Sequence, residues 1–450
     1  MAHHHLHHNQ KISILEQYQV SAPPGSVPST SLPLTFYDIP WFYSHHIQRI
    51  FFYHFPHPTH HFLHTLLPTL KHSLSLTLQH FFPFAANLVF PPQPHLHHPY
   101  ILYNESDSIP LTVAESTADF NLLVSHSPKP VSDLHPLVPA LPPPRASQNG
   151  TRFVPLMAVQ LTVLPNSGFC ICLAFNHVAG DGAAFHHFMK YWASVCRARG
   201  DLNSLEPSLP LPCHSREIID DPKGIKLIYL EELSDTASKS MEFAGLVHDD
   251  VSIDKVRATF VMSRDQIEKL KKLVSNSIRC TSSGNLHISA FVVTCSLMWV
   301  CMVKLKSEET QGGNNNVPCK LVILADCRNL SSVSIPSTYF GNCLVTRFVT
   351  LERGQLVGEN GLFEAVKAIE RQVRDVKSDA LRGVETLMSD YREVSKSGEP
   401  LLTIAGSPKL GVYETDFGDE DGGIEVGVAL TRTQMNDFTA IFKEQVGHIE

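Results

Sequence analysis

The sequence predicts an α/β or α+β protein built as two domains or two halves. The chain has 450 residues, whereas a single core stops growing near ~250–300 residues. Strand-like and helix-like segments are mixed in both halves of the chain. Hydrophobic residues make up 43% of the chain and charged residues 18%. This is enough apolar surface for two packed cores and too much for intrinsic disorder.

The first half is expected to combine an arm, two helices and a β-hairpin. Residues 1–30 are polar and contain prolines, which predicts an extended arm. Apolar residues recur every three or four positions over 59–78, as in an amphipathic helix. The β-rich runs 153–164 and 169–175 are separated by Pro-Asn-Ser-Gly, a turn signal that predicts an antiparallel hairpin. A helix is expected over 183–199, followed by a glycine that suits its C-terminal end.

The second half is expected to follow a crossover between the two halves. Residues 201–226 contain prolines and show little periodicity, so the crossover is placed there. Ser263 and Ser289 are placed to begin two helices, and Thr433 to cap the last one. The other predicted elements are strands over 257–262, 321–325, 344–351 and 423–430, and a helix over 359–379.

Charge and cysteine content exclude several classes of protein. The net charge of −8, with Lys and Arg scattered, argues against a nucleic-acid partner. The longest apolar run, 290–303, is shorter than the ~20 residues of a membrane span and predicts a buried helix. The ten cysteines form no C-x-x-C pair, and no signal-peptide pattern opens the chain. We therefore expect a cytoplasmic protein with reduced thiols and no membrane contact.

The candidate catalytic residues are His177 and Asp181, within the segment Asn-His-Val-Ala-Gly-Asp-Gly at 176–182. Gly180 and Gly182 break any helix there, so the two side chains do not share a helical face. Such a strand-to-helix turn can expose the imidazole and direct the carboxylate into the protein. An imidazole with a near-neutral pKa suits a general base. The alternative is a structural histidine, because H-x-x-x-D alone is a weak pattern.

Other short segments follow in a fixed order along the chain. L-P-L-T-F at 32–36 precedes the histidine segment, Y-F-G-N-C at 339–343 follows it, and D-F-G at 416–418 lies near the end. Together these segments resemble the plant BAHD acyltransferases. The match is to the flavonoid and phenolic glucoside malonyltransferase branch, which also contains aromatic acyltransferases. The resemblance covers nearly the whole chain.

This resemblance implies two similar-sized domains, each a mixed sheet with flanking helices. The first would span 1–200 and carry H-x-x-x-D, the crossover loop would span 201–226, and 227–450 would carry the other two motifs. A solvent channel would run between the domains, with the histidine reachable from both faces. The family default is a monomer that binds no cofactor and uses a coenzyme A thioester as co-substrate.

The implied activity is acyl-coenzyme A-dependent O-acyl transfer. His177 would take the proton from an acceptor hydroxyl, and the alkoxide would attack the thioester. The favoured reaction is malonyl transfer from malonyl-coenzyme A to the glucosyl 6-hydroxyl of a flavonoid or phenolic glucoside. One alternative is a hydroxycinnamoyl donor. Another, of a different class, is an inactive truncated relative that only binds ligands.

The resemblance also assigns supporting residues. Asp181 would point away from the channel and pair with Arg328; the alternative is a catalytic triad in which Asp181 orients His177. Tyr339 and Asn342 would line the substrate channel or only shape a turn. No metal site is expected, because no cysteine or carboxylate set completes the histidines near the motif.

The end of the chain departs from the family pattern. Asp416, Phe417 and Gly418 would support the site structurally. D-F-G also occurs in protein kinases, but the Gly-rich loop, V-A-I-K and H-R-D are missing. The family continues D-F-G-W-G with a further strand, whereas here the acidic residues 419–421 follow directly. About twenty residues of the family pattern are therefore missing, which would expose a sheet edge and leave a gap in the core.

Overall fold

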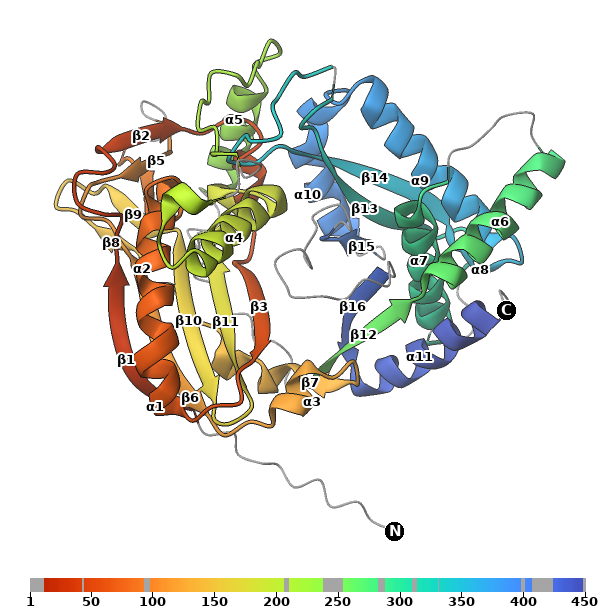
Figure 1. Ribbon diagram of the computed structural model, residues 1–450. Coiled ribbons are helices and arrows are strands. Elements are labelled where there is room, and N and C mark those ends of the chain that lie inside the picture. The colour runs from red at the N-terminus through yellow and green to blue at the C-terminus, as the bar shows by residue number, and fades with distance from the viewer. Residues whose placement is uncertain are drawn as a thin grey trace. The chain divides into compact units, whose positions relative to one another are not determined.

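The computed structural model divides the chain into two compact units (Figure 1). Unit 1 comprises the described parts of Met1–Leu34 and Trp41–Arg216; unit 2 comprises those of Thr35–Pro40, Glu217–Met241 and Asp254–Glu450. Both contain sheets and helices, which confirms the α/β prediction. The structure describes residues 12–42, 44–92, 98–205, 210–237, 254–281, 288–309, 314–330, 332–397, 401–406 and 424–447.

A five-stranded sheet forms the centre of unit 1. Its strands lie in the order β1 (Ile12–Val20), β6 (Ile109–Ser116), β10 (Met157–Leu164), β11 (Gly168–Phe175) and β3 (Ile47–His54). β10 and β11 are buried along their whole length and pair antiparallel, which confirms the predicted hairpin. Asn166 in the connecting turn has a φ of 61°, a left-handed conformation that asparagine tolerates.

The prediction of an extended arm over 1–30 is wrong for Ile12–Val20. This segment is strand β1, which pairs antiparallel with β6 at the edge of the sheet. Most of its side chains are half-buried or exposed. An edge strand with one wet face tolerates polar residues, so its sequence lacks the continuous apolar pattern of β10 and β11.

A second sheet and two packed helices complete unit 1. The sheet order is β2 (Thr30–Pro33), β5 (Tyr100–Tyr103), β4 (Asn87–Phe90), β9 (Arg152–Pro155) and β8 (Arg145–Ala146). The helix predicted over 59–78 is confirmed as the consecutive segments α1 (Thr59–His61), η2 (Phe62–Leu66) and α2 (Leu67–Leu78). The helix predicted over 183–199 is α4 (Gly182–Arg197). Trp192 of α4 donates its indole N–H to Leu70 O and Ser73 Oγ of α2, at 3.3 and 3.0 Å.

Shorter elements connect these parts of the chain. They are η1 (Ile39–Trp41), η3 (Phe82–Phe84), α3 (Phe120–Val124), β7 (Lys129–Pro130), η4 (Val131–Asp133), η5 (His135–Leu137), η6 (His177–Ala179) and η7 (Leu202–Ser204). The predicted crossover at 201–226 contains η7 and the start of α5 (Ile225–Ala237), and the chain passes from unit 1 to unit 2 after Arg216. The assignment of whole domains to 1–200 and 227–450 stays a prediction.

Unit 2 carries two small sheets over one core. One has the order β14 (Leu344–Glu352), β13 (Pro318–Asp326) and β15 (Leu401–Ile404), and the other contains the antiparallel pair β12 (Lys255–Met262) and β16 (Ile424–Thr431). Helix α7 (Ala290–Glu309) shares this core with both sheets. The other helices are α6 (Arg264–Thr281), α8 (Arg353–Val357), α9 (Gly361–Ser378), η8 (Val384–Thr386), α10 (Leu387–Ser397) and α11 (Arg432–Gly447).

Helix α7 is buried as predicted, but it is longer than the apolar run that predicted it. It has 20 residues, and by length and composition alone the stretch Ala290–Ser307 could cross a membrane. Of that stretch, 67% is buried within the protein, and Trp299 is only 1% exposed. The shortness of the run was therefore the wrong argument for a core helix, and its packing in unit 2 is the right one.

Two of the three predicted helix starts in unit 2 are confirmed. Ser263 Oγ accepts from Gln266 N, and Ser289 Oγ from Val292 N, each at 3.2 Å. The prediction for the last helix is wrong. Its capping hydroxyl belongs to Thr431, which accepts from Gln434 N at 3.3 Å. Thr431 directly precedes the helix, whereas Thr433 lies in its first turn. The sequence pattern alone did not separate two positions so close together.

Candidate active site

The segment that carries His177 is a turn between the buried strand β11 and helix α4. The Asn176 N–H donates to Leu156 O at 2.8 Å, which continues the hairpin pairing to the last residue before the turn. The Asn176 side chain accepts from the Val178 N–H at 3.0 Å and begins the 3-10 turn η6. The backbone of His177 is therefore fixed by hydrogen bonds on both sides, and the residue is 7% exposed.

Asp181 is the N-cap of α4. Its carboxylate accepts from Ala184 N at 3.1 Å, and the residue is fully buried. A carboxylate here binds a backbone N–H that the helix leaves unpaired and lies at the positive end of the helix dipole. This contact is consistent with an architectural role. The pairing of Asp181 with Arg328, a residue of unit 2, stays a prediction, as does the triad alternative.

The imidazole of His177 lies against the indole of Trp41. The ring centroids are 3.7 Å apart and the ring planes differ by 11°, so the rings stack face to face. Trp41 is the last residue of η1, and its carbonyl accepts from both the backbone N–H and the hydroxyl of Ser44. The candidate base is therefore held through its backbone and also through one face of its ring.

The histidines that follow on α4 have different surroundings. His186 is buried, and burial lowers its pKa to about 4, so it is neutral near pH 7. A ring nitrogen of His187 lies 2.7 Å from Pro210 O. In the described part of the chain, no group of three or more His, Cys, Asp or Glu side chains is arranged to hold a metal ion.

In unit 2 the segment Thr35–Pro40 binds the Y-F-G-N-C segment through a buried carboxylate. Asp38 Oδ1 accepts from the backbone N–H and the side-chain Nδ2 of Asn342, at 3.3 and 3.0 Å. Asp38 Oδ2 accepts from the N–H and hydroxyl of Thr35, at 2.8 and 2.9 Å. Hydrogen bonds to an ionised acceptor are the stronger kind. This carboxylate therefore ties together two motifs that lie far apart in the sequence.

Arg328 fixes the backbone of the same loop. Its Nε donates to Tyr339 O at 3.0 Å and its Nη2 to Gly341 O at 2.9 Å. Its Nη1 forms an ion pair with Asp326 at 3.0 Å. Gly341 has a φ of 146°, in the region that favours glycine. Arg328 thus holds the backbone turn of the Y-F-G-N-C segment in place.

Tyr339 and Asn342 are almost completely buried, at 1% and 0% exposed. Together with the contacts of Asp38 and Arg328, this burial fits the turn-shaping alternative. Their role as channel-lining residues stays a prediction. Asp416, Phe417 and Gly418 lie outside the described residues.

Two important residues were not singled out by sequence reasoning. Trp41 and Asp38 both lie in the aromatic-rich stretch after L-P-L-T-F. The available signal was the placement of a carboxylate, Asp38, and a tryptophan within an otherwise apolar segment. Their partners Asn342 and His177 are far away in the sequence, so only the tertiary structure reveals the contacts.

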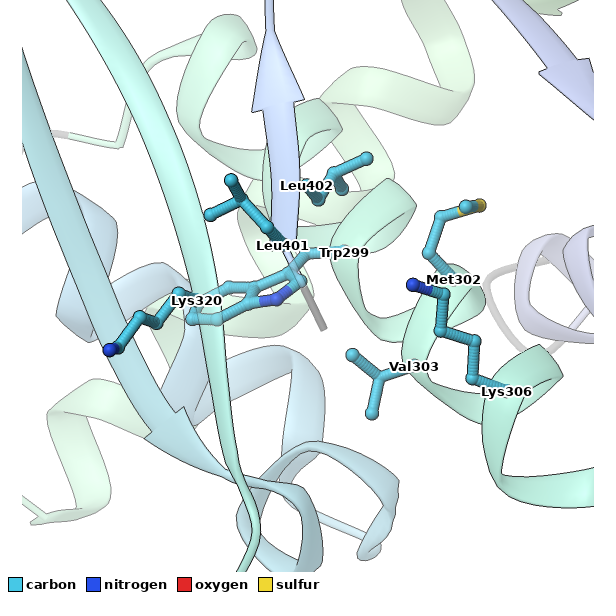
Figure 2. Close-up of a pocket in the computed structure, with 7 residues that line it drawn as sticks. All are labelled: Trp299, Met302, Val303, Lys306, Lys320, Leu401 and Leu402. Carbon is cyan, nitrogen blue, oxygen red and sulfur yellow. The ribbon is translucent and has the colours of Figure 1, made fainter. Parts of the chain in front are cut away.

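A small hollow in unit 2 lies beside the edge strand β15. It has about 240 Å³ of empty space, part of it open to solvent. Figure 2 shows the side chains that line it, which come from α7, β13 and β15. They are mostly apolar, with lysine side chains among them: Trp299, Met302, Val303, Lys306, Lys320, Leu401 and Leu402.

Solved acyltransferase structures share this fold. Vinorine synthase matches with a TM-score of 0.63 at 16% identity, over 95% of this chain and 96% of that chain. TRI101 of F. sporotrichioides, in complex with coenzyme A and T-2, matches with a TM-score of 0.59 at 14% identity, over 93% and 98%. These two likenesses show that the chain has the fold of these enzymes.

The family follows from the sequence comparison. The model of the Transferase family matches residues 10–421. The chain therefore belongs to this transferase family, the BAHD acyltransferases, and it is an acyltransferase that uses acyl-coenzyme A as co-substrate.

The curated relatives match over nearly their whole length. Coumaroyl-CoA:anthocyanidin 3-O-glucoside-6''-O-coumaroyltransferase 1 of Arabidopsis thaliana is 38% identical, over 98% of both chains. Malonyl-coenzyme A:anthocyanin 3-O-glucoside-6''-O-malonyltransferase of Dahlia pinnata is 35% identical, over 96% of this chain and 97% of the relative. Phenolic glucoside malonyltransferase 1 of Nicotiana tabacum is 33% identical, over 97% and 100%.

The alignment lengths indicate that this chain lacks residues its relatives have. The alignment with the Arabidopsis enzyme has 475 positions, whereas 98% of 450 residues is about 441, which leaves about 34 positions without a residue of this chain. For the tobacco enzyme, 467 positions and 97% coverage leave about 30. These positions include every insertion of the relative along the whole alignment, so the deletion after Gly418 stays a prediction.

Proposed function

We propose that this protein transfers an acyl group from coenzyme A to the glucosyl 6-hydroxyl of a flavonoid or phenolic glucoside. The observation that carries the proposal is the fixed turn that holds His177 between β11 and the capped helix α4. The family membership supplies the reaction type. The substrate class comes from the names of relatives that are 32–38% identical over nearly the whole chain.

His177 is the general base of the proposed reaction. It removes the proton from the acceptor hydroxyl, and the resulting alkoxide oxygen forms a bond to the thioester carbonyl carbon. The tetrahedral oxyanion collapses with cleavage of the carbon–sulfur bond and releases the coenzyme A thiolate. The thiolate recovers the proton from the imidazolium, so charge and atoms balance. No covalent acyl-enzyme is required, because binding both substrates together removes much of the entropic barrier.

Asp181 supports this reaction through the structure of the turn. Its hydrogen bond to Ala184 N fixes the start of α4, and the turn that carries His177 ends there. Because the Asp181 carboxylate caps the helix, an architectural role suits it better than orienting His177 in a catalytic triad. Arg328 and Asn342 are proposed to fix the second motif in the same indirect way.

Malonyl is the first candidate for the acyl group, and a hydroxycinnamoyl group is the second. One observation supports the hydroxycinnamoyl donor. Two coumaroyltransferases from Arabidopsis thaliana are 38% identical to the chain, whereas the malonyltransferases are 32–35% identical. The donor therefore has to be determined directly.

The test is an acyl transfer assay with purified protein and a panel of anthocyanin and simple phenolic glucosides. Malonyl- and coumaroyl-coenzyme A are offered separately, and thiol release and the mass of the acylated glucoside are both measured. Product with one donor and one glucoside class supports the proposal. Binding of coenzyme A and glucoside by calorimetry, with no thiol release from either donor, would instead support the inactive truncated relative.

A further inference from the structure

The indole of Trp41 and the imidazole of the candidate base His177 stack face to face. The centroid separation of 3.7 Å and the interplanar angle of 11° place one ring face over the other. Both residues belong to unit 1, although they come from segments far apart in the sequence. The stack is therefore a tertiary contact that covers one face of the imidazole.

Trp41 is held independently of the histidine. Its carbonyl oxygen accepts from Ser44 N at 3.2 Å and from Ser44 Oγ at 2.8 Å. Its indole Nε1–H is buried and has no hydrogen-bond acceptor among the described residues. A buried indole usually pairs its N–H, so the contact that accounts for a tryptophan here is the ring face it presents to His177.

The backbone contacts of Asn176 and Asp181 act on the main chain around His177, whereas the stack with Trp41 acts on its ring. Asn176 and Asp181 bind main-chain groups of the turn and of α4, and they fix where the side chain starts. They do not fix rotation about the bonds that lead to the ring. A flat surface against one ring face restricts that rotation. It also favours the imidazolium that forms when the base takes its proton, because an aromatic face attracts a cation.

We propose that Trp41 is a positioning residue for His177. Its indole holds the imidazole plane for proton transfer from the acceptor hydroxyl. This inference rests on the proposed function of His177 as general base. Trp41 acts through His177, and a flat aromatic ring at this position is what the role requires.

The first arm of the test detects the stack without relying on turnover. Histidine in ring contact quenches tryptophan emission, so the emission due to Trp41 is measured as the difference between the unmodified protein and Trp41→Phe. The same difference is measured in a His177→Gln background, with His64→Gln, an exposed histidine, as matched control. We expect the Trp41 emission to rise with His177→Gln and to stay unchanged with His64→Gln. Equal emission in all three backgrounds overturns the stack.

The second arm tests positioning through kcat and KM for acyl transfer. Displacing a catalytic group by about 1 Å costs about 100-fold, so Trp41→Leu is expected to lower kcat by about 10- to 100-fold with little change in KM for the acyl-coenzyme A donor. Trp41→Phe keeps a flat ring and loses the N–H, so it should retain most of the activity. Thermal unfolding of both variants shows whether they are folded.

The outcomes separate the two claims. Full kcat in folded Trp41→Leu, or equal losses in the Phe and Leu variants, overturns positioning by ring stacking. Absence of turnover in the unmodified protein defeats the proposed function, and positioning for this reaction with it. Quenching of the Trp41 emission by His177, together with a kcat that Trp41→Phe retains and Trp41→Leu loses, supports the inference.

Discussion

His177 is placed by three neighbours that act on different parts of it. Asn176 fixes the start of its turn, Asp181 caps the helix that follows, and Trp41 covers its ring. Sequence reasoning found the histidine and the aspartate because both lie within one short segment with glycines. It did not find Trp41, because a stack between distant segments leaves no spacing pattern in the sequence.

An architectural Asp181 predicts a loss of stability rather than of chemistry. Asp181→Ala removes the acceptor for Ala184 N, and loss of an N-cap costs about 0.5–2 kcal/mol of unfolding free energy. The kcat of the folded variant should fall much less than the 10²–10⁴-fold typical of losing a general base. Denaturant unfolding and steady-state kinetics check both quantities. Asp181→Asn, which retains a capping oxygen, is the matched control; an unchanged unfolding curve with a large kcat loss would support the triad instead.

At the scale of secondary structure, the sequence predicted the elements whose pattern is set locally. The helix over 59–78, the hairpin β10–β11 and the helix starts at Ser263 and Ser289 all follow from periodicity, turn residues or caps. Strand β1 was missed because its edge position lets polar side chains face solvent. Which of Thr431 and Thr433 caps the last helix depends on where that helix begins. Sequence patterns place a helix start only to within a residue or two.

Because His186 is buried on helix α4, we expect the free energy of unfolding to depend on pH. Burial lowers its pKa in the folded state to about 4, whereas the ordinary value is 6.5. Between these values the unfolded chain binds a proton that the folded chain does not, so unfolding free energy falls as the pH drops from 6.5 towards 4. The stability that the neutral His186 allows is present in full above pH 6.5.

The measurement is denaturant unfolding at several pH values between 4 and 7. His186→Gln should flatten the decline in stability over that window compared with the unmodified protein. His64→Gln is the control, because His64 is exposed on a helix of the same unit. A His186→Gln variant whose stability declines as steeply as that of the unmodified protein would contradict the assignment.

At the scale of the whole chain, the deletion predicted after Gly418 would fall between β15 and β16 of unit 2. β15 is the outermost strand of one sheet and β16 of the other in the described part of unit 2. Side chains of both strands pack against the same core. The apolar hollow next to β15 (Figure 2) marks a place where that core is open. Loss of a strand next to such an edge would expose unpaired backbone groups.

Supplying the segment that is predicted to be missing should therefore stabilise unit 2. Insertion after Gly418 of the strand-containing segment found in relatives is expected to raise the midpoint of thermal unfolding and sharpen the transition, because it covers a sheet edge and apolar core. A Gly/Ser insertion of equal length is the control, and loop lengthening alone costs only about 0.6 kcal/mol per doubling. Equal unfolding curves for the two insertions would show that the segment adds nothing to the stability of unit 2.

The part of the site that could be predicted from sequence is the part encoded in contiguous motifs. Family resemblance identified Arg328, Tyr339 and Asn342, and the structure shows which backbone groups and carboxylates these residues bind. The role of Asp38 needed the structure, because it joins two motifs separated by most of the chain.

The central claim is that His177 is the general base for acyl transfer from coenzyme A. The most direct measurement is the rate of thiol release and acyl-glucoside formation by the unmodified protein and by His177→Ala, with the preferred donor and acceptor at saturating concentration. We predict that kcat falls about 10²–10⁴-fold, while the variant still binds coenzyme A and unfolds at nearly the same temperature. A folded His177→Ala variant that retains kcat within a few-fold of the unmodified protein would contradict the claim.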